Sequence, residues 1–407
     1  MEVMNQPFSG QLGNRLIELL ESSDYHTLDI AVAFAKNSGV LRIKDYLKKF
    51  REEGGKINVY VGVDLGGTSY EALTALLLHT DSLNVVHSEG SQTFHSKIYH
   101  FSGAKSGFLV VGSHNLTAGG LWTNFESSVH IPTDGAIANG FAVHKETSVY
   151  FKELTSLKGS FMSITTQEEI DTLLQEGYVT KEVANSVWST STTKRSGTGP
   201  RLFGNGTPAK LPRLTPSKAK NQAAVSANPT GSLTFAASAK KKTIWFETRR
   251  MTGGSRNILD LSKRSLVERG DPTGTPFDLG EPNFMRGGVE FFGLDSTDTT
   301  KSKSIMINFE GVDYDGNTIL FPEGDNANGS WRLQIKGASS SNTKITEAFR
   351  ARANDYLVQK VITFTEVQAD YYFMSVFLEA DLESFKTASS ILARNGPNRS
   401  AKFLGLL

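Results

Sequence analysis

Residues 94–126 read FHSKIYHFSGAKSGFLVVGSHNLTAGGLWTNFE, and this stretch decides the fold that the sequence predicts for the N-terminal part of the chain. Two apolar runs, residues 96–101 and 107–113, flank a polar segment that contains Gly103, a pattern typical of a β-hairpin. Side chains alternate along a strand, so His95 and Lys97 share a face and an imidazole lies beside a cation. Such a pair suits a phosphodiester substrate.

The end of the second run carries further polar side chains. Ser113 and Asn115 again share a face, and both can donate hydrogen bonds to the non-bridging oxygens of a phosphate. Glu126 follows on the next expected strand. There a carboxylate can accept a hydrogen bond from Nδ1 of His95 and leave Nε2 free to attack phosphorus. These side chains are the candidate catalytic group.

Two absences in the composition narrow the chemistry. The chain has 407 residues and no cysteine, which excludes disulfides, thiolate zinc sites and a thiol nucleophile. From residue 90 to residue 125 there is also no Asp or Glu, whereas two-metal cleavage of phosphodiesters needs clustered carboxylates. We therefore expect a site that works without a metal or any other cofactor.

The segments before this stretch alternate between strand and helix patterns. Apolar residues at helical spacing predict helices over residues 12–20, 40–51 and 70–78. Apolar runs predict strands over residues 28–34, 57–63 and 83–87. Alternating units of this kind predict a layered α/β domain.

The candidate catalytic residues resemble the signature of the phospholipase D superfamily. That signature is HxK, then GSxN, then a Glu, and His95, Lys97, Ser113, Asn115 and Glu126 stand here in matching order. The resemblance covers residues 1 to about 155. It implies a mixed sheet flanked by helices.

The resemblance also implies a mechanism that needs two motifs. In the family one His becomes a phosphohistidine nucleophile, its counterpart protonates the leaving oxygen, and the Lys and Asn pairs bind the phosphate. This chain has one motif and no internal repeat, so we expect a homodimer that contributes His95 from each subunit. Gly103 stands where lipid-cleaving members have an Asp, and nuclease-type members also lack that Asp.

The other histidines carry no expected role in catalysis. All eight histidines of the chain lie at or before residue 144. His114 should face away from Ser113 and Asn115, which makes it structural. His87, His100 and His130 lie near strand ends, and no function is assigned to them.

A competing motif is GVDLGGTS, residues 62–69, which resembles the phosphate-binding turn of actin-fold sugar kinases. Glycines there let backbone N–H groups approach phosphates. In a kinase that turn joins the first two strands, whereas here a helix and at least two strands come first. The motif is therefore expected to be a tight strand-to-helix turn beside the active site.

The charge distribution divides the chain. Residues 1–182 have net charge −7, residues 183–246 have +10, and residues 247–407 have −2. We predict a nuclease-like domain over residues 1–182, a basic Pro/Ser/Gly-rich linker over 183–242, and a second domain over 243–407. The linker is either a solvated tether or a sliding contact for nucleic acid.

The second domain has a mainly-β pattern. Apolar runs predict strands over residues 305–312, 317–322, 330–337, 360–367 and 371–378, with one helix at about 343–357. Asp315-Gly316 is a hairpin signal. The pattern favours a barrel-like domain.

Basic residues surround a loop near the start of this domain. Arginine forks on a loop between strands suit guanine edges and phosphates. The alternative is a solvated, charged loop. The candidate DNA contacts are Arg249, Arg250, Arg256 and Asn257 on and beside the TGGSRN loop, with Arg332 and Lys336 on a second arm.

The order of the domains resembles restriction endonucleases of the NgoFVII/BfiI type. In that family a phospholipase D-like nuclease is followed by a B3-like pseudobarrel that reads a short DNA sequence. The resemblance implies a metal-independent, homodimeric DNA endonuclease that acts in restriction or phage defence on double-stranded DNA. A cognate methyltransferase is a possible partner, and some relatives work with a separate helicase-like ATPase. This chain has no GxxxxGK[ST] loop, so any dependence on ATP must come from such a partner.

Two other functions remain open at this point. One is a phospholipase D-type phosphodiesterase or phosphatidyl transferase, and the other is a DNA-binding protein whose nuclease fold is catalytically inactive. The N-terminus has no signal-peptide pattern, and no apolar run approaches the length of a membrane span. We expect a cytoplasmic protein without a membrane partner.

Overall fold

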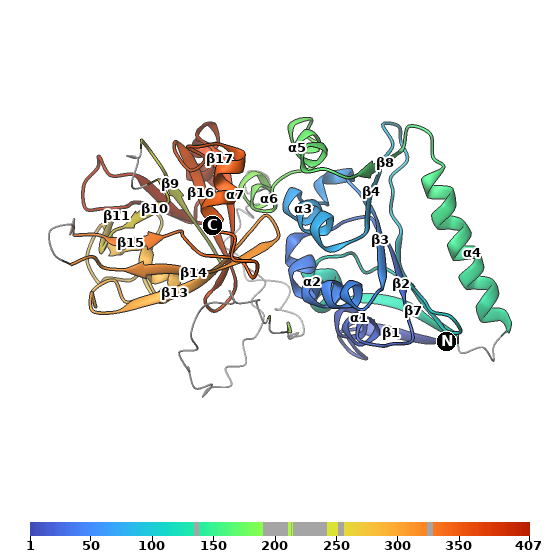
Figure 1. Cartoon of the computed structure of the whole chain (residues 1–407). Coiled ribbons are helices and arrows are strands. Elements are labelled where there is room, and N and C mark those ends of the chain that lie inside the picture. The colour runs from blue at the N-terminus through green and yellow to red at the C-terminus, as the bar shows by residue number, and fades with distance from the viewer. Residues whose placement is uncertain (134–137, 190–210, 213, 215–241, 251–255, 324–328) are drawn as a thin grey trace, which may run out of the picture. The chain divides into compact units, whose positions relative to one another are not determined.

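The computed structural model describes residues 1–133, 138–189, 211–212, 214, 242–250, 256–323 and 329–407 (Figure 1). The chain forms two compact units, one holding Met1–Glu182 and the other holding Ala239–Leu407. Most of the predicted basic linker, residues 183–242, lies outside the described residues, as does the Gly253-Gly254 part of the predicted DNA-reading loop. No described helix is both long enough and apolar enough to cross a membrane.

An eight-stranded mixed sheet forms the centre of the first unit. Its order is β1-β7-β6-β5-β2-β3-β4-β8. The β2, β3 and β4 strands are parallel and the other pairs are antiparallel. The strands are β1 (Glu2–Gln6), β2 (Thr27–Val32), β3 (Lys56–Gly62), β4 (Ser82–Val86), β5 (Lys97–Ser102), β6 (Gly107–Gly112), β7 (Glu126–Thr133) and β8 (Phe161–Ile164).

Helices cover both faces of this sheet (Figure 1). On one face lie α1, α2 and α3, whose apolar stripes join the strands in the main core; α4 packs against the other face through Phe151 and Leu154. The predicted mixed sheet flanked by helices is therefore confirmed. The helical segments of this unit are α1 (Leu12–Leu20), α2 (Asn37–Glu52), η1 (Asp64–Gly66), α3 (Tyr70–His79), η2 (Gly119–Thr123), α4 (Ala138–Thr155) and α5 (Gln167–Gln175). The next helix, α6 (Glu182–Ser189), begins at Glu182 and otherwise belongs to the second unit.

The predicted hairpin is β5 and β6. The two strands pair antiparallel from Ile98 opposite Val111 to Ser102 opposite Gly107, and residues 103–106 form the turn. This pairing brings the start of β5 and the end of β6 to the same edge of the hairpin. The polar residues that precede β5 therefore lie near those that follow β6.

A buried glutamine fixes the segment that leads from β6 to β7. The side-chain amide of Gln6, at the end of β1, donates to the carbonyl oxygens of Gly120 (3.2 Å) and Asn124 (3.0 Å). Its Oε1 accepts from the amide of Leu12 at the start of α1, at 3.2 Å. Because a buried polar group must find partners, this side chain holds β1, η2 and α1 in one arrangement.

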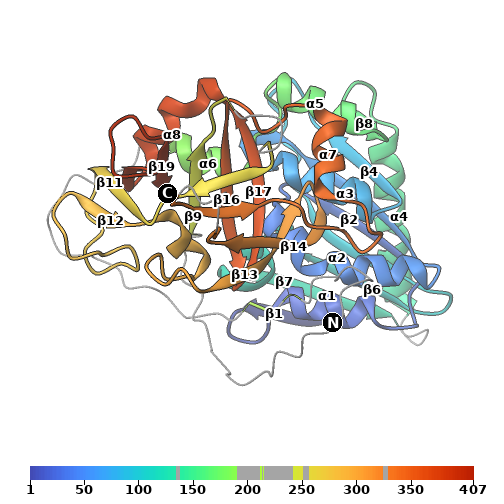
Figure 2. The ribbon, with the colours of Figure 1, turned by 60° about the vertical axis from the view of Figure 1, so that its left-hand side comes forward.

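The second unit contains an eleven-stranded sheet with the order β10-β15-β14-β13-β17-β16-β9-β19-β18-β11-β12. Figure 2 shows β9, β16 and β17 side by side, as their pairing requires. The strands are β9 (Thr243–Glu247), β10 (Ile258–Leu261), β11 (Arg264–Arg269), β12 (Phe284–Arg286), β13 (Ser302–Phe309), β14 (Val312–Leu320), β15 (Trp331–Gln334), β16 (Lys360–Gln368), β17 (Tyr371–Leu378), β18 (Ile391–Arg394) and β19 (Phe403–Leu406).

The mainly-β character of this unit is confirmed, with short helical segments η4 (Gly288–Phe292), α7 (Ile345–Arg352), η6 (Glu379–Asp381) and α8 (Leu382–Ala388). The predicted helix at about 343–357 corresponds to α7. A closed, B3-like pseudobarrel is not shown, since the strand order of the described residues runs from β10 to β12 without closing.

The hairpin predicted at Asp315-Gly316 is wrong. The β13–β14 hairpin turns at Glu310-Gly311, which have φ of 49° and 83°, and Phe309 pairs with Val312. Gly316, with φ of 86°, lies within β14, where the register with β13 shifts. A two-residue turn and a β-bulge both place glycine at positive φ, so the dipeptide signal does not distinguish them.

Two buried histidines meet where α4 covers the sheet. Nε2 of His100 on β5 lies 2.8 Å from Nδ1 of His144 on α4, and Nε2 of His144 lies 3.2 Å from the carbonyl of Ile131. If both rings are neutral, each donates from Nε2 and Nδ1 of His100 is left without a hydrogen-bond partner. Burial, and then the charge of His144, lower the pKa of His100 to about 4.

This low pKa predicts acid destabilisation. An unfolded His100 binds its proton near the ordinary pKa of 6.5, whereas the folded ring resists protonation until about pH 4. The contribution of neutral His100 to the free energy of unfolding is therefore complete above pH 6.5. It is lost as the pH falls from 6.5 to 4, and the loss amounts to up to about 3 kcal/mol. The free energy of unfolding, measured with urea across this pH range, should depend less on pH for His100→Gln than for the wild type. His26→Gln, at an exposed position, should follow the wild type, and equal slopes for all three proteins would contradict the assignment.

Candidate active site

The segment before β5 holds the candidate nucleophile. His95 is exposed, two residues before the strand, and Lys97 is buried as the first residue of β5. Nζ of Lys97 lies 2.8 Å from Nδ1 of His95 and donates to the His95 carbonyl oxygen, also at 2.8 Å. The predicted pairing of an imidazole with a cation is therefore present, between the segment that precedes β5 and the first residue of that strand.

This contact determines the tautomer of His95. An ammonium group only donates hydrogen bonds, so with Lys97 charged, Nδ1 of His95 accepts and the ring proton resides on Nε2. The prediction that Glu126 accepts from Nδ1 is wrong for this arrangement, because Lys97 occupies that position. A nucleophilic Nε2 therefore requires that Lys97 move away from Nδ1 when a phosphate binds.

Burial and charge act on Lys97 in opposite directions. Desolvation lowers the pKa of Lys97 below its ordinary value, and the negative charge of Glu126 partly offsets this decrease. The carboxylate of Glu126 thus stabilises the ammonium form, although it makes no contact with the imidazole. Glu126 is the first residue of β7 and is half-buried.

Ser113 connects this carboxylate to the end of β6. The hydroxyl of Ser113 donates to Oε2 of Glu126 and accepts from the amide of Ser127 at 3.1 Å. Asn124 donates to the other carboxylate oxygen at 3.2 Å. Glu126 therefore has a fixed orientation.

Asn115 is held by the chain next to β2. Its Oδ1 accepts a hydrogen bond from the amide of Phe34 at 3.0 Å, which orients Nδ2 as the donor for another group. The ring of Phe34 also lies edge-on to His95, with centroids 6.1 Å apart. One residue, Phe34, therefore contacts both the candidate nucleophile and the candidate phosphate donor.

His114 is structural, as expected. It is buried, with Nδ1 2.8 Å from the carbonyl of Gly120 and Nε2 3.1 Å from the hydroxyl of Ser128. Both ring nitrogens are engaged within the fold. His114 is thus not available to exchange protons with a substrate.

A cavity of about 600 Å³ lies beside Ser113 and Glu126. Phe8 and Phe125 line it as a stacked pair with centroids 5.7 Å apart, and they are 72% and 63% exposed. The remaining lining residues are Asn5, Gln6, Ser9 and Ser127. Exposed aromatic side chains of this size are uncommon on a surface that stays in water.

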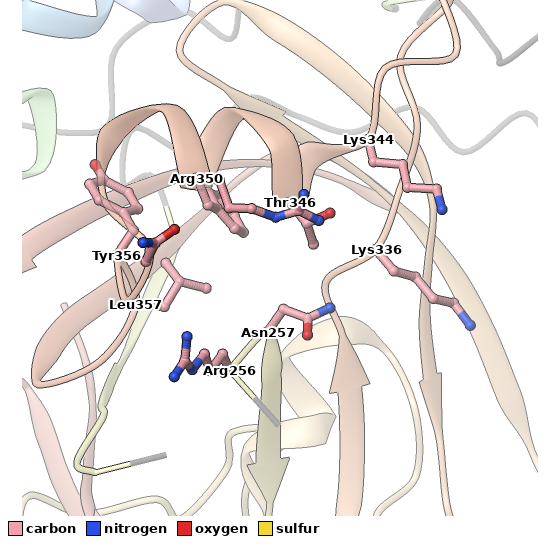
Figure 3. A pocket seen from close by; sticks show the side chains of 10 residues that line it. Arg256, Asn257, Lys336, Lys344, Thr346, Arg350, Tyr356 and Leu357 are labelled. Atoms are coloured by element: carbon pink, nitrogen blue, oxygen red, sulfur yellow. The ribbon is translucent and has the colours of Figure 1, made fainter. Parts of the chain in front are cut away.

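The second unit brings together some of the predicted DNA contacts. Arg256, Asn257 and Lys336 line a groove of about 610 Å³ between β10, β15 and α7. Figure 3 shows Lys336 and Lys344 extending in the same direction beside Asn257. Lys344 and Arg350, on and beside α7, also line the groove.

These last two residues were missed in the sequence. Lys344 immediately precedes a helix and Arg350 is six residues later, so the helical pattern alone gave no reason to pair them with Lys336. Within the groove, Arg256 forms an ion pair with Asp355 at 2.7 Å. Asn257 donates to the carbonyl of Ile335 at 2.9 Å, which fixes the floor.

Other predicted DNA contacts lie outside the groove. Arg249 pairs with Glu247 at 2.8 Å and donates to the carbonyl of Ser400 at 2.9 Å, so it serves the local packing. Arg250 is exposed. Arg332 is partly buried, 3.8 Å from the carboxylate of Asp260.

The described residues contain no group of three or more His, Asp or Glu side chains that could hold a metal ion. No protein-family model and no curated protein sequence matches the chain.

The chain is similar to several solved structures. NucT from Helicobacter pylori is 14% identical, with 40% of this chain and 98% of that chain covered and a TM-score of 0.30. Nuc from Salmonella typhimurium, a phospholipase D family member, is 15% identical, with coverages of 40% and 97% and a TM-score of 0.30. Phosphatidylserine synthase from Haemophilus influenzae is 11% identical, with coverages of 42% and 43% and a TM-score of 0.29. Similarities of this size carry no argument about function, which rests on the chain's own residues.

Proposed function

We propose that this protein is a metal-independent DNA endonuclease of the phospholipase D-like type. It hydrolyses phosphodiesters through a phosphohistidine at His95, at a site completed by a second copy of the chain. The second unit directs it to double-stranded DNA, in the setting of restriction or phage defence. The observation that carries the proposal is the contact of Lys97 with His95, with Asn115 and the Ser113–Glu126 pair beside them.

The first chemical step follows from these positions. A phosphate oxygen attracts the Lys97 ammonium, which releases Nδ1 of His95 and allows the ring proton to move there. Nε2 then attacks phosphorus and forms an N–P bond as the P–O bond to the leaving group breaks. Asn115 and Lys97 stabilise the charge on the non-bridging oxygens.

The leaving oxygen needs a proton, which the proposal takes from a second imidazole. His114 has both nitrogens engaged, and Nδ1 of His87 is bound by Asp64 at 2.9 Å. The donor in the proposal is therefore His95 of a second copy. The same group, once deprotonated, activates the water that hydrolyses the N–P bond and regenerates both rings.

Cleavage in excess EDTA tests this chemistry. Plasmid DNA and bis(p-nitrophenyl) phosphate, a diester without a sequence, should both be hydrolysed by the wild type. His95→Ala should lower the rate by roughly 10³-fold or more. His26→Ala, at an exposed histidine, should leave it unchanged. The proposal would be contradicted if the wild type hydrolysed neither substrate in EDTA, or if His95→Ala hydrolysed them as fast as the wild type.

The surface around the site supports the second copy. Phe8 and Phe125 are exposed beside Glu126, and the side chains of Val3 and Val111 are exposed on β1 and β6. The register aligns both valines with the same residue of β7, so they belong to one row across the sheet. Exposed aromatic and aliphatic side chains such as these are typical of a protein interface.

Replacing an aromatic of this surface should separate the subunits. Phe125→Ser should raise the dimer dissociation constant by roughly 30-fold, the effect of losing an interface hot spot. Sedimentation velocity over a concentration series measures this, and activity per chain should recover at high concentration. Leu157→Ser, at a similarly exposed residue elsewhere in the first unit, is the matched control. A wild type that is monomeric and fully active would remove the shared site.

The groove of the second unit supports the DNA-binding part of the proposal. Lys336, Lys344 and Arg350 are exposed on its walls, and Arg256 lies opposite them. Three or four cations along one groove suit the phosphates of a DNA backbone. Asn257 at the floor offers an amide edge suited to adenine, although its Nδ2 is already engaged by Ile335.

The groove cations predict the salt dependence of binding. In a His95→Ala background, each of Lys336→Ala, Lys344→Ala and Arg350→Ala should lower DNA affinity and reduce the slope of log K against log salt by about 1. Fluorescence anisotropy over a salt series measures both quantities. Lys301→Ala, at an exposed lysine outside the groove, should leave the slope intact. A triple variant with wild-type affinity and slope would rule out the groove.

A further inference from the structure

The turn that follows β3 makes direct contact with the segment that carries His95. Residues 87–96 have no helix or strand, so hydrogen bonds and packing must hold His95 in place. We propose that Asp64, within the GVDLGG turn, is the positioning residue for His95. This inference rests on the proposed function for its kinetic consequence, and its structural part stands without it.

One carboxylate binds both ends of the His95 segment. Oδ2 of Asp64 accepts the backbone N–H of Phe94, the residue before His95, at 3.2 Å. Oδ1 of Asp64 lies 2.9 Å from Nδ1 of His87, where the segment begins. The Asp64 side chain is only 10% exposed, so water competes little for these contacts.

The far side of His87 is also held. Its ring lies edge-on to Tyr178, with centroids 5.3 Å apart, and the Tyr178 hydroxyl donates to Glu89 at 2.5 Å. His87 is therefore a fixed partner for Asp64. The first and last parts of the segment cannot move independently while both contacts persist.

The glycines of the turn admit the neighbouring chain. A Cβ on Gly67 would lie 1.9 Å from the ring of Phe34, and a Cβ on Gly62 would lie 2.7 Å from the carbonyl of Ala33 and 3.1 Å from that of Phe94. Phe34 is the residue that contacts both His95 and Asn115. The glycines thus bring Phe34 and the His95 segment against the turn, which accounts for GVDLGG without a bound nucleotide.

Positioning of this kind acts on the rate of the chemical step. A nucleophile must be held within a fraction of an ångström of its attack position, and a misplacement of about 1 Å costs on the order of 10²-fold in rate. Asp64 contacts no substrate atom in this scheme. Its effect reaches the reaction through the backbone of Phe94 and the orientation of the His95 ring.

Asp64→Asn is the test, since it preserves the shape but places an NH₂ group against one of the two donors. We expect kcat for bis(p-nitrophenyl) phosphate to fall between about 10- and 100-fold with KM changed less than about twofold. Asp81→Asn is the matched control. Asp81 likewise accepts a backbone amide, that of Ile57 at 2.9 Å, and a basic side chain, Arg51 at 3.1 Å, away from the site.

A second readout needs no activity. The Cε1–H NMR resonance of His95, assigned with His95→Ala, should shift or broaden in Asp64→Asn and stay unchanged in Asp81→Asn. His87→Leu, which removes one of the two contacts, should give a smaller change in the same direction and serves if Asp64→Asn does not fold. A His95 resonance that is unchanged in both Asp64→Asn and His87→Leu would overturn the positioning role of Asp64. A wild type that hydrolyses no diester, with the resonance change intact, would overturn only the proposed function.

Discussion

The contact between the Lys97 ammonium and Nδ1 of His95 is the constraint on which the site depends. The ammonium group donates its hydrogen bond to Nδ1 and so directs the proton of a neutral His95 ring to Nε2. Glu126 balances the cation, and Ser113 and Asn124 fix the carboxylate. The pair is thus prepared to accept an anion, since the negative charge of a phosphate attracts the Lys97 ammonium.

The rest of the first unit maintains this arrangement. The β5–β6 hairpin brings the two halves of the motif to one edge, and Gln6 fixes the connection that ends at Glu126. Asp64 and Phe34 act on the opposite side, where the chain has no regular structure of its own. In the proposed mechanism one imidazole cannot serve as both nucleophile and acid within a single displacement. The exposed aromatic pair beside the site is where we propose that a second copy of the chain binds and supplies the other histidine.

The sequence predicts most of the first unit because its signals are local. Alternating runs gave the β5–β6 hairpin, and helical spacing gave α1 to α3. The sequence also paired His95 with Lys97, but the reason it used was wrong, since His95 precedes β5 and is not part of the strand. The contact partner of His95 was predicted incorrectly, since side-chain contacts between distant strands depend on rotamers and burial that spacing does not encode.

Helix α4 was not predicted because β-branched and aromatic residues such as Val149 and Tyr150 lower its helix propensity, and only packing on the sheet stabilises it. Asp315-Gly316 was misplaced because a bulge and a turn share one backbone requirement. The ion pair between Arg249 and Glu247 was not predicted, because the two side chains become neighbours only on the folded strand.

Trapping the covalent intermediate tests the central claim most directly. Internally radiolabelled DNA would be mixed with the protein in EDTA, denatured in alkaline detergent and separated by electrophoresis, followed by mass spectrometry of the labelled peptide. The account predicts a label on the protein that is stable in base, lost in acid and attached to His95, as expected for an N–P bond. A wild type that cleaves DNA without acquiring such a label, or that carries it on another residue, would contradict the account.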